Sequence, residues 1–265
     1  MKQQGHISLQ QLGERLSAFG NDLSRRNALA LQPHPDDAPK PTIRRMLGEL
    51  GSPAEVWGEI RRRRRAGLVH ASAAIPRPVM LLPGFGTKPA RMRRMADELE
   101  RAGHRVSDWG LGFNLGPTEE RFEHLLSRIA AMARKEGEPL ALVGWSLGGI
   151  FAREAARHAP HAVAKVITLG TPFSVHRRAN NAWRAYQWIT GHEVEHAPVA
   201  VDLAEKPPVP TIAIWSPRDG IVHPRSACGR PGERDRAVAL RCTHLAFSNH
   251  PDVIAEVLRQ LDIEE

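Results

Sequence analysis

The sequence is poor in cysteine and contains no long apolar stretch. Only two of its 265 residues are cysteines. No uninterrupted apolar run approaches the roughly 18 residues that a membrane-spanning helix needs. Residues 1–6 also lack the apolar region of a secretory signal peptide. We therefore expect a cytoplasmic protein.

The two cysteines, Cys228 and Cys242, allow one disulfide at most. Such a bond would tie the loop that contains residue 219 to the strand expected at 237–242. In a reducing cytosol free thiols are the default. Both states of the pair stay open at this point.

Signatures of nucleic-acid recognition are also missing. There is no zinc-ligand spacing, RNA-binding signature or helix-turn-helix pattern. The net charge is nonetheless +8, because 37 Lys and Arg residues stand against 29 Asp and Glu residues. Five consecutive arginines, Arg61 to Arg65, suit either an anionic surface or the solvated C-terminal end of a helix, and we favour the helix end. We expect no specific nucleic-acid partner.

The most informative stretch is residues 140–149, where apolar and small residues lead into a G-x-S-x-G motif centred on Ser146. A helix-forming run follows at once, over residues 150–158. A nucleophile elbow requires this strand, tight turn and helix. The turn strains the serine backbone and crowds the positions two residues either side, which explains Gly144 and Gly148. We predict that Ser146 is a nucleophile at a helix N-terminus, where the helix dipole favours developing negative charge.

A serine nucleophile needs a base, and the base needs an orienting carboxylate. Around a nucleophile elbow they follow in the order Ser, Asp, His, each on a loop after a later strand. The apolar run 211–215 reads as a buried strand, and the turn after it contains Asp219. The run 237–242 reads as another strand, and His244 follows it. We predict Asp219 as the acid and His244 as the base.

Three other residues compete for these two roles. His250 precedes Pro251 and could instead cap the last helix, expected at about 251–261. Asp202 lies in a proline-flanked segment with no strand before it. His223 also lacks a preceding strand, and we expect it to be an exposed loop residue.

An oxyanion hole is the fourth part of such a site. The short apolar run 79–82 predicts a buried strand, and a glycine-rich loop, residues 83–87, follows it. Such a loop lets backbone N–H groups face the position where a carbonyl oxygen becomes an oxyanion. We assign the donors as the N–H groups of Phe85 and Leu147.

With these motifs in place, the chain resembles the α/β-hydrolases, and within them the bacterial esterase and lipase types. The matching segments cover roughly residues 77–263. The resemblance implies ester hydrolysis through a covalent acyl-serine. Many members have His-Gly where this chain has Pro83-Gly84, but the donor there is a backbone N–H, so we expect the hole to survive. The segments that carry the resemblance are 83–86, 144–149, 169–172, 218–222 and 243–245.

The remaining pattern fits the same architecture, a mostly parallel central sheet with helices on both faces. We expect strands and helices to alternate from residue 79 onward, with six strands in all. Thr118 should cap a helix that runs to about Lys135. The expected strands are 79–82, 105–109, 140–145, 163–169, 211–215 and 237–242, and a further helix is expected at 89–102.

A long insertion, residues 174–210, interrupts this alternation at the C-terminal edge of the sheet. We expect a small, partly helical cap over the active site. The tentative pocket residues are aromatic, since aromatic-walled concave sites are common; the alternative is that they only pack the cap onto the body. They are Trp145, Trp183, Tyr186 and Trp188.

Residues 1–75 form the least informative part of the chain, an arginine-rich N-terminal extension to a hydrolase domain over residues 76–265. Apolar spacing predicts a helix over Ile7 to Leu23, and a proline-rich break follows at 32–41. Further helices are expected at 42–50 and 54–65. These helices could pack on the body or serve a partner.

The sequence therefore predicts a carboxylic ester hydrolase that needs no metal or cofactor and acts on a small-molecule or lipid-like ester. Two alternatives remain open. One is an acyltransferase that uses the same three residues, and the other is a non-catalytic binding protein with this fold. The oligomeric state does not follow from the sequence.

Overall fold

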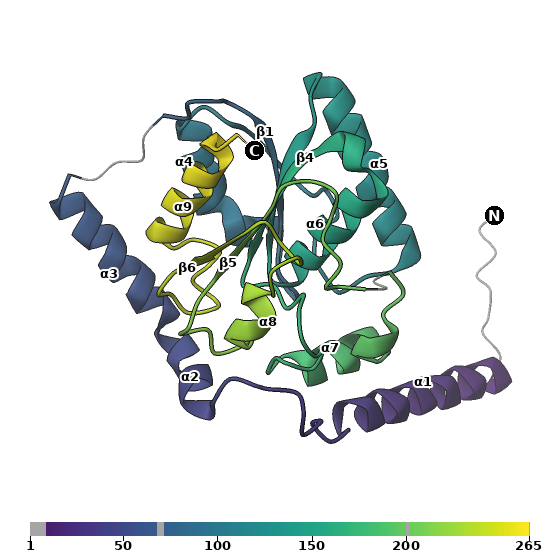
Figure 1. The fold of residues 1–265 in the computed structure, drawn as a ribbon. Coiled ribbons are helices and arrows are strands. Elements are labelled where there is room, and N and C mark those ends of the chain that lie inside the picture. Colours follow the sequence, from purple (N-terminus) through teal and green to yellow (C-terminus); the bar gives the residue numbers. More distant parts are fainter. Residues whose placement is uncertain (1–8, 68–71, 200–201, 265) are drawn as a thin grey trace, which may run out of the picture.

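In a computed structural model, residues 9–67, 72–199 and 202–264 are described, and their six strands form one parallel sheet (Figure 1). The strand order is β2-β1-β3-β4-β5-β6, so the chain reverses its direction of progress across the sheet after β2. The number of strands agrees with the prediction. The strands are β1 (Pro78–Leu82), β2 (Arg105–Asp108), β3 (Leu140–Trp145), β4 (Val163–Leu169), β5 (Thr211–Trp215) and β6 (Arg236–Ala239).

Helices cover both faces of this sheet, which is why the central strands are mostly apolar. All residues of β1 and β3 are buried. In Figure 1, α4 (Arg93–Arg101) and α9 (Pro251–Asp262) lie on one face, and α5 (Glu119–Glu136) and α6 (Leu147–His158) lie on the other. Two hydrophobic clusters, one per face, therefore share the sheet between them.

Local signals set the ends of several helices. The Thr118 side chain accepts a hydrogen bond from the Arg121 N–H at the start of α5, and Gly137 ends that helix in the left-handed conformation. The predicted helix at 89–102 opens as a 3₁₀ turn, η2 (Pro89–Met92), before α4. A short 3₁₀ turn, η3 (Pro160–Ala162), links α6 to β4.

The last strand is shorter than predicted. It ends at Ala239 rather than at Cys242. The hydroxyl of Ser216 donates to the Cys242 carbonyl at 2.6 Å and accepts from the Cys242 N–H at 3.3 Å. This side chain therefore takes the backbone groups that a longer sheet ladder would use. Cys242 and Cys228 are both free, and burial raises the pKa of the Cys242 thiol.

The N-terminal extension is helical and lies against the rest of the chain. It consists of α1 (Leu9–Ala30), α2 (Ile43–Gly48), the 3₁₀ turn η1 (Glu49–Gly51) and α3 (Ser52–Arg65). Helix α1 runs beyond its predicted end, while residues 7 and 8 of that prediction lie outside the described part of the chain. In Figure 1, α1 passes beside α7 (Trp183–Thr190), and α3 packs beside α9.

The insertion predicted at 174–210 contains α7 and the 3₁₀ turn η4 (Val194–His196). A further helix, α8 (Pro224–Cys228), follows β5. Across the described parts of the chain, no helix is both long and apolar enough to cross a bilayer.

The turn from β3 into α6 leaves no room for side chains, and this gives a stability prediction. A Cβ on Gly148 would lie 2.2 Å from the Leu82 carbonyl oxygen. Gly148→Ala should therefore lower the free energy of unfolding by about 1–3 kcal/mol or more, measured by urea denaturation. Gly58 in α3 is the matched control, since nothing lies within 4 Å of an added Cβ.

Gly58→Ala should be neutral or stabilising by about 0.5–1 kcal/mol, because alanine lowers the backbone entropy of the unfolded chain. Equal effects of the two substitutions would contradict the close approach at Gly148.

Candidate active site

The predicted nucleophile lies at a strained turn between β3 and α6. Ser146 has φ 54° and ψ −121°, a conformation that costs a non-glycine residue free energy. Its N–H donates to the Leu169 carbonyl of β4 at 2.8 Å. A Cβ on Gly144 would lie 2.4 Å from the Gly148 carbonyl oxygen, so the glycines on both sides of the serine are sterically required.

The predicted acid and base meet in a buried pair. Nδ1 of His244 donates to Oδ2 of Asp219 at 2.8 Å, and neither residue is more than 3 % exposed. The other oxygen of Asp219 accepts the N–H groups of Ile221 and Val222 at 2.9 and 2.7 Å. The bond to the carboxylate fixes the proton on Nδ1, which leaves Nε2 as the nitrogen that can accept a proton.

This pairing shifts the titration of the imidazole. Burial by itself disfavours the protonated ring, but the charge of Asp219, the hydrogen bond to it and the charge of Glu49 act in the opposite direction. Together they raise the pKa of His244 above its usual value of 6.5.

The competing residues serve local structure. His250 is the N-cap of α9, where its ring accepts the Asp252 N–H. The Asp202 carboxylate accepts the N–H of Ala204 within the insertion. His223, expected as an exposed loop residue, instead caps α8 and is partly buried. The capping role of His250 was one of its two predicted roles.

A cavity of about 100 Å³ opens beside the serine. Ser146 and both predicted oxyanion donors, Phe85 and Leu147, line it. Two of the four predicted aromatics, Trp183 and Tyr186, also line it, and the ring centroids of Phe85 and Tyr186 are 5.4 Å apart. Burial raises the pKa of the Tyr186 phenol, so the phenol stays neutral. The other lining residues are mostly apolar: Pro117, Ile150, Pro172, Arg177, Asn180, Ala182, Val194, Ala197, Leu203, Ile221 and Val222.

The other two aromatics are not among the residues that line this cavity, and their role as pocket residues stays a prediction. Trp145 is buried in the cluster on the α4 and α9 face, and its Nε1 donates to the His244 carbonyl at 3.2 Å. The alternation of side chains along β3 puts Trp145 on the same face as Val143, a signal present in the sequence. Trp188 is 46 % exposed, and its Nε1 donates to Asn27 of α1.

The loop that carries Phe85 is held by a residue that the sequence did not reveal. Asn114 is fully buried, and its side-chain amide donates to the Pro83 carbonyl at 2.7 Å. The backbone carbonyl of Asn114 accepts the Gly86 N–H at 2.7 Å. Within the described residues, the N–H groups of Phe85 and Leu147 have no backbone partner outside helices and strands. Leu147 is the first residue of α6, where N–H groups lack an intrahelical acceptor.

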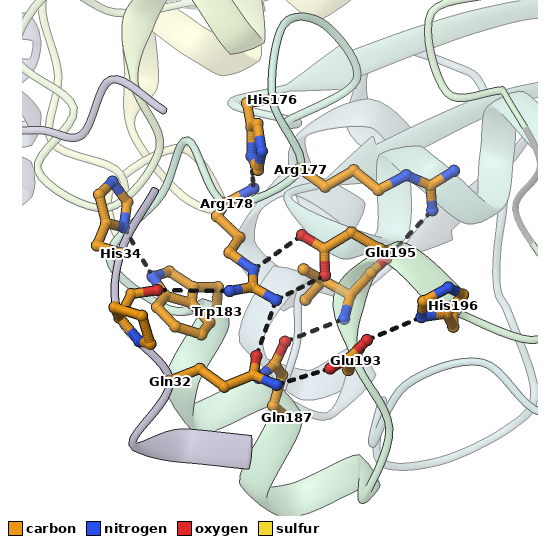
Figure 2. Close-up of polar contacts among 12 residues, drawn as sticks. Gln32, His34, His176, Arg177, Arg178, Trp183, Gln187, Glu193, Glu195 and His196 are labelled. Carbon is orange, nitrogen blue, oxygen red and sulfur yellow. Dashed lines mark hydrogen bonds and ion pairs between the residues drawn. The ribbon is translucent and has the colours of Figure 1, made fainter. Parts of the chain in front are cut away.

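The segment that contains Arg178, Trp183 and Glu195 is hydrogen-bonded to the N-terminal extension (Figure 2). Arg178 donates to Glu195 at 2.8 Å and to the side chain of Gln32 at 2.8 Å, and its guanidinium lies 4.7 Å from the Trp183 ring centroid. The indole N–H of Trp183 donates to Nδ1 of His34 at 3.2 Å. The cavity wall therefore rests on residues that lie about 150 positions earlier in the chain.

No group of three or more His, Cys, Asp or Glu side chains with the geometry of a metal site occurs in the described parts of the chain. Polar side chains that line the cavity include those of Ser146, Arg177 and Asn180, while His244 and Asp219 are not among the lining residues.

A family model described as the alpha/beta hydrolase fold matches residues 77–203. In sequence, the chain is similar to curated pimeloyl-acyl-carrier protein methyl ester esterases of Vibrio parahaemolyticus and Aliivibrio salmonicida. The first is 34 % identical over 112 residues, which cover 41 % of this chain and 42 % of the relative. The second is 29 % identical over 108 residues, 40 % of each chain. The chain thus spans about two fifths of the length of the curated relatives it matches.

Solved structures share the fold at low sequence identity. A Bacillus licheniformis lipase in propeptide form has a TM-score of 0.56 at 15 % identity, over 75 % of this chain and 54 % of the lipase. Lipase B of Aspergillus fumigatus has a TM-score of 0.54 at 18 % identity, over 73 % of this chain and 55 % of that chain.

The imidazole–carboxylate pair gives a prediction that does not depend on activity. Asp219→Asn removes the charge that holds the pKa of His244 up, so that pKa should fall, as measured by NMR titration of the ring protons. Asp202→Asn is the control and should leave the titration unchanged. A fall of equal size in both variants would contradict the observed pairing.

Proposed function

We propose that the chain is a carboxylic ester hydrolase with Ser146 as its nucleophile, since residues 77–203 match a family model described as the alpha/beta hydrolase fold. The observation that carries the proposal is the buried bond between His244 and Asp219, on loops at the same sheet edge as the strained serine. If Ser146 were only part of a glycine-rich turn, its strained backbone and the buried pair would have no purpose.

The proposed reaction has two halves. His244 takes the proton of the Ser146 hydroxyl as its oxygen attacks the ester carbonyl, and Asp219 stabilises the imidazolium that forms. The N–H groups of Phe85 and Leu147 donate to the oxyanion. The C–O bond to the alcohol breaks, and the alcohol leaves with the proton from His244. Water then attacks the acyl-serine by the same steps, which frees the acid and restores the serine.

The cavity narrows the substrate class. Its volume of about 100 Å³ is well below the roughly 300–1,000 Å³ of sites that hold drug-sized ligands, and most of its lining is apolar. We therefore propose a short or medium acyl group rather than a long lipid chain. The curated relatives carry the name of a methyl ester esterase, which supports ester cleavage as the reaction class.

Two further features of the protein stay predictions. One is the cytoplasmic location. The other is contact between the run Arg61 to Arg65 and an anionic surface. Arg61, Arg62, Arg64 and Arg65 are exposed, which favours the solvated end of a helix, and Arg63 pairs with Asp252 at 2.6 Å.

A series of p-nitrophenyl esters from acetyl to palmitoyl tests the activity. Turnover should be highest for the shorter chains, and Ser146→Ala should lower kcat by about a thousandfold or more. Ser72→Ala, at an exposed position, is the matched control and should leave turnover unchanged. Absence of turnover on every ester from folded protein would contradict the proposal, and a palmitoyl optimum would contradict the proposed acyl size.

The pH dependence gives a second test. His244 must be neutral to accept a proton, so kcat/KM should rise with pH as the imidazole loses its proton. Since the pKa of His244 is raised, the midpoint of this rise should lie above pH 6.5. A midpoint below that value would show that another group controls the reaction.

A further inference from the structure

A carboxylate from the N-terminal extension accepts hydrogen bonds from the backbone next to the acid–base pair. Glu49, in η1, is only 4 % exposed. Its Oε1 accepts the N–H of Gly220 and the N–H of His244, both at 2.8 Å. Its Oε2 accepts the N–H of Leu245 at 2.9 Å. Three charge-assisted hydrogen bonds thus converge on one buried side chain.

The three N–H groups belong to two different loops. Gly220 follows the acid Asp219 in the loop after β5, while His244 and Leu245 lie in the loop after β6. One carboxylate therefore bridges the two loops, and its two oxygens fix their separation. The distance between the acid and the base depends on that separation.

A second contact keeps Glu49 in place. A Cβ on Gly220 would lie 2.3 Å from the Arg45 carbonyl oxygen of α2, so the extension packs on this loop without space between them. The contact involves backbone on both sides, and neither partner can shift as a flexible side chain would.

A glutamate of the neighbouring helix α3 makes similar contacts with Thr243, one residue before His244 in the loop after β6. Oε2 of Glu55 in α3 accepts the Thr243 N–H at 3.1 Å and the Thr243 hydroxyl at 2.8 Å. Its Oε1 lies 3.3 Å from Arg218, which precedes the acid. Both loops are therefore held from the extension at two successive points.

We propose that Glu49 is a positioning residue of the active site, and that the N-terminal extension completes the catalytic machinery by holding the acid and base loops together. This inference rests on the proposed hydrolase function. The residue lies outside the segment 77–203 that matches the family model.

The charge of Glu49 acts on the base as well. It is one of the groups that raise the pKa of His244, together with the nearer Asp219. A variant without this charge should therefore have a lower imidazole pKa, which a purely structural support would not produce.

Glu49→Gln tests the proposal, because it keeps the side-chain size, removes the charge and replaces one acceptor oxygen with a donor that faces N–H groups. We expect kcat to fall by about tenfold to a hundredfold with KM changed by less than about threefold. The rise of kcat/KM should move to lower pH, and the NMR titration of His244 should move the same way.

Glu59→Gln is the matched control. Glu59 lies in α3 and pairs with Arg62 and Arg63 of the same helix. It should leave kcat, the pH profile and the His244 titration as in the wild type. Glu49→Asp, which keeps the charge on a shorter side chain, should lower kcat while leaving the His244 titration close to that of the wild type.

Wild-type kcat together with an unchanged His244 titration in Glu49→Gln would overturn the inference. If that variant fails to fold, Glu49→Asp decides, and a wild-type kcat there would overturn it. If the wild type cleaves no ester, the proposed function fails while the titration of His244 in Glu49→Gln still decides whether Glu49 acts on the base.

Discussion

The close approach of backbone at the turn between β3 and α6 is the constraint on which the rest of the site depends. Added Cβ atoms at Gly144, Gly148 and Gly149 would all lie within 2.4 Å of neighbouring atoms. Those atoms belong to the turn itself, to the end of β1 and to Thr171 after β4. Because nothing separates these segments, Ser146 is held in its strained conformation beside three strand ends.

The sheet brings the loops to one edge, but side chains from distant segments set the distances between them. Asn114 holds the loop of Phe85, and Glu49 joins the loops of Asp219 and His244. Arg178 donates to Gln32 and so links the cavity wall to the N-terminal extension (Figure 2). The residues around the cavity therefore depend on contacts made by the extension as well as on the sheet.

Much of this could be predicted because it is encoded locally. Apolar runs marked the strands, and a G-x-S-x-G motif between a strand and a helix marked the turn at Ser146. The contact between Glu49 and His244 joins residues 195 positions apart, and no local pattern announces it. The predicted end of β6 is wrong for a related reason, because the Ser216 hydroxyl binds backbone groups of Cys242.

The proposed reaction depends on attack by Ser146 on an acyl carbon with the help of His244. Reaction with diethyl p-nitrophenyl phosphate, followed by peptide mass spectrometry, tests this most directly, because the organophosphate stays on the attacked atom. We expect one diethylphosphoryl group on Ser146 in the wild type and much slower labelling in His244→Ala. Labelling of another residue, or no labelling of folded wild-type protein, would contradict it.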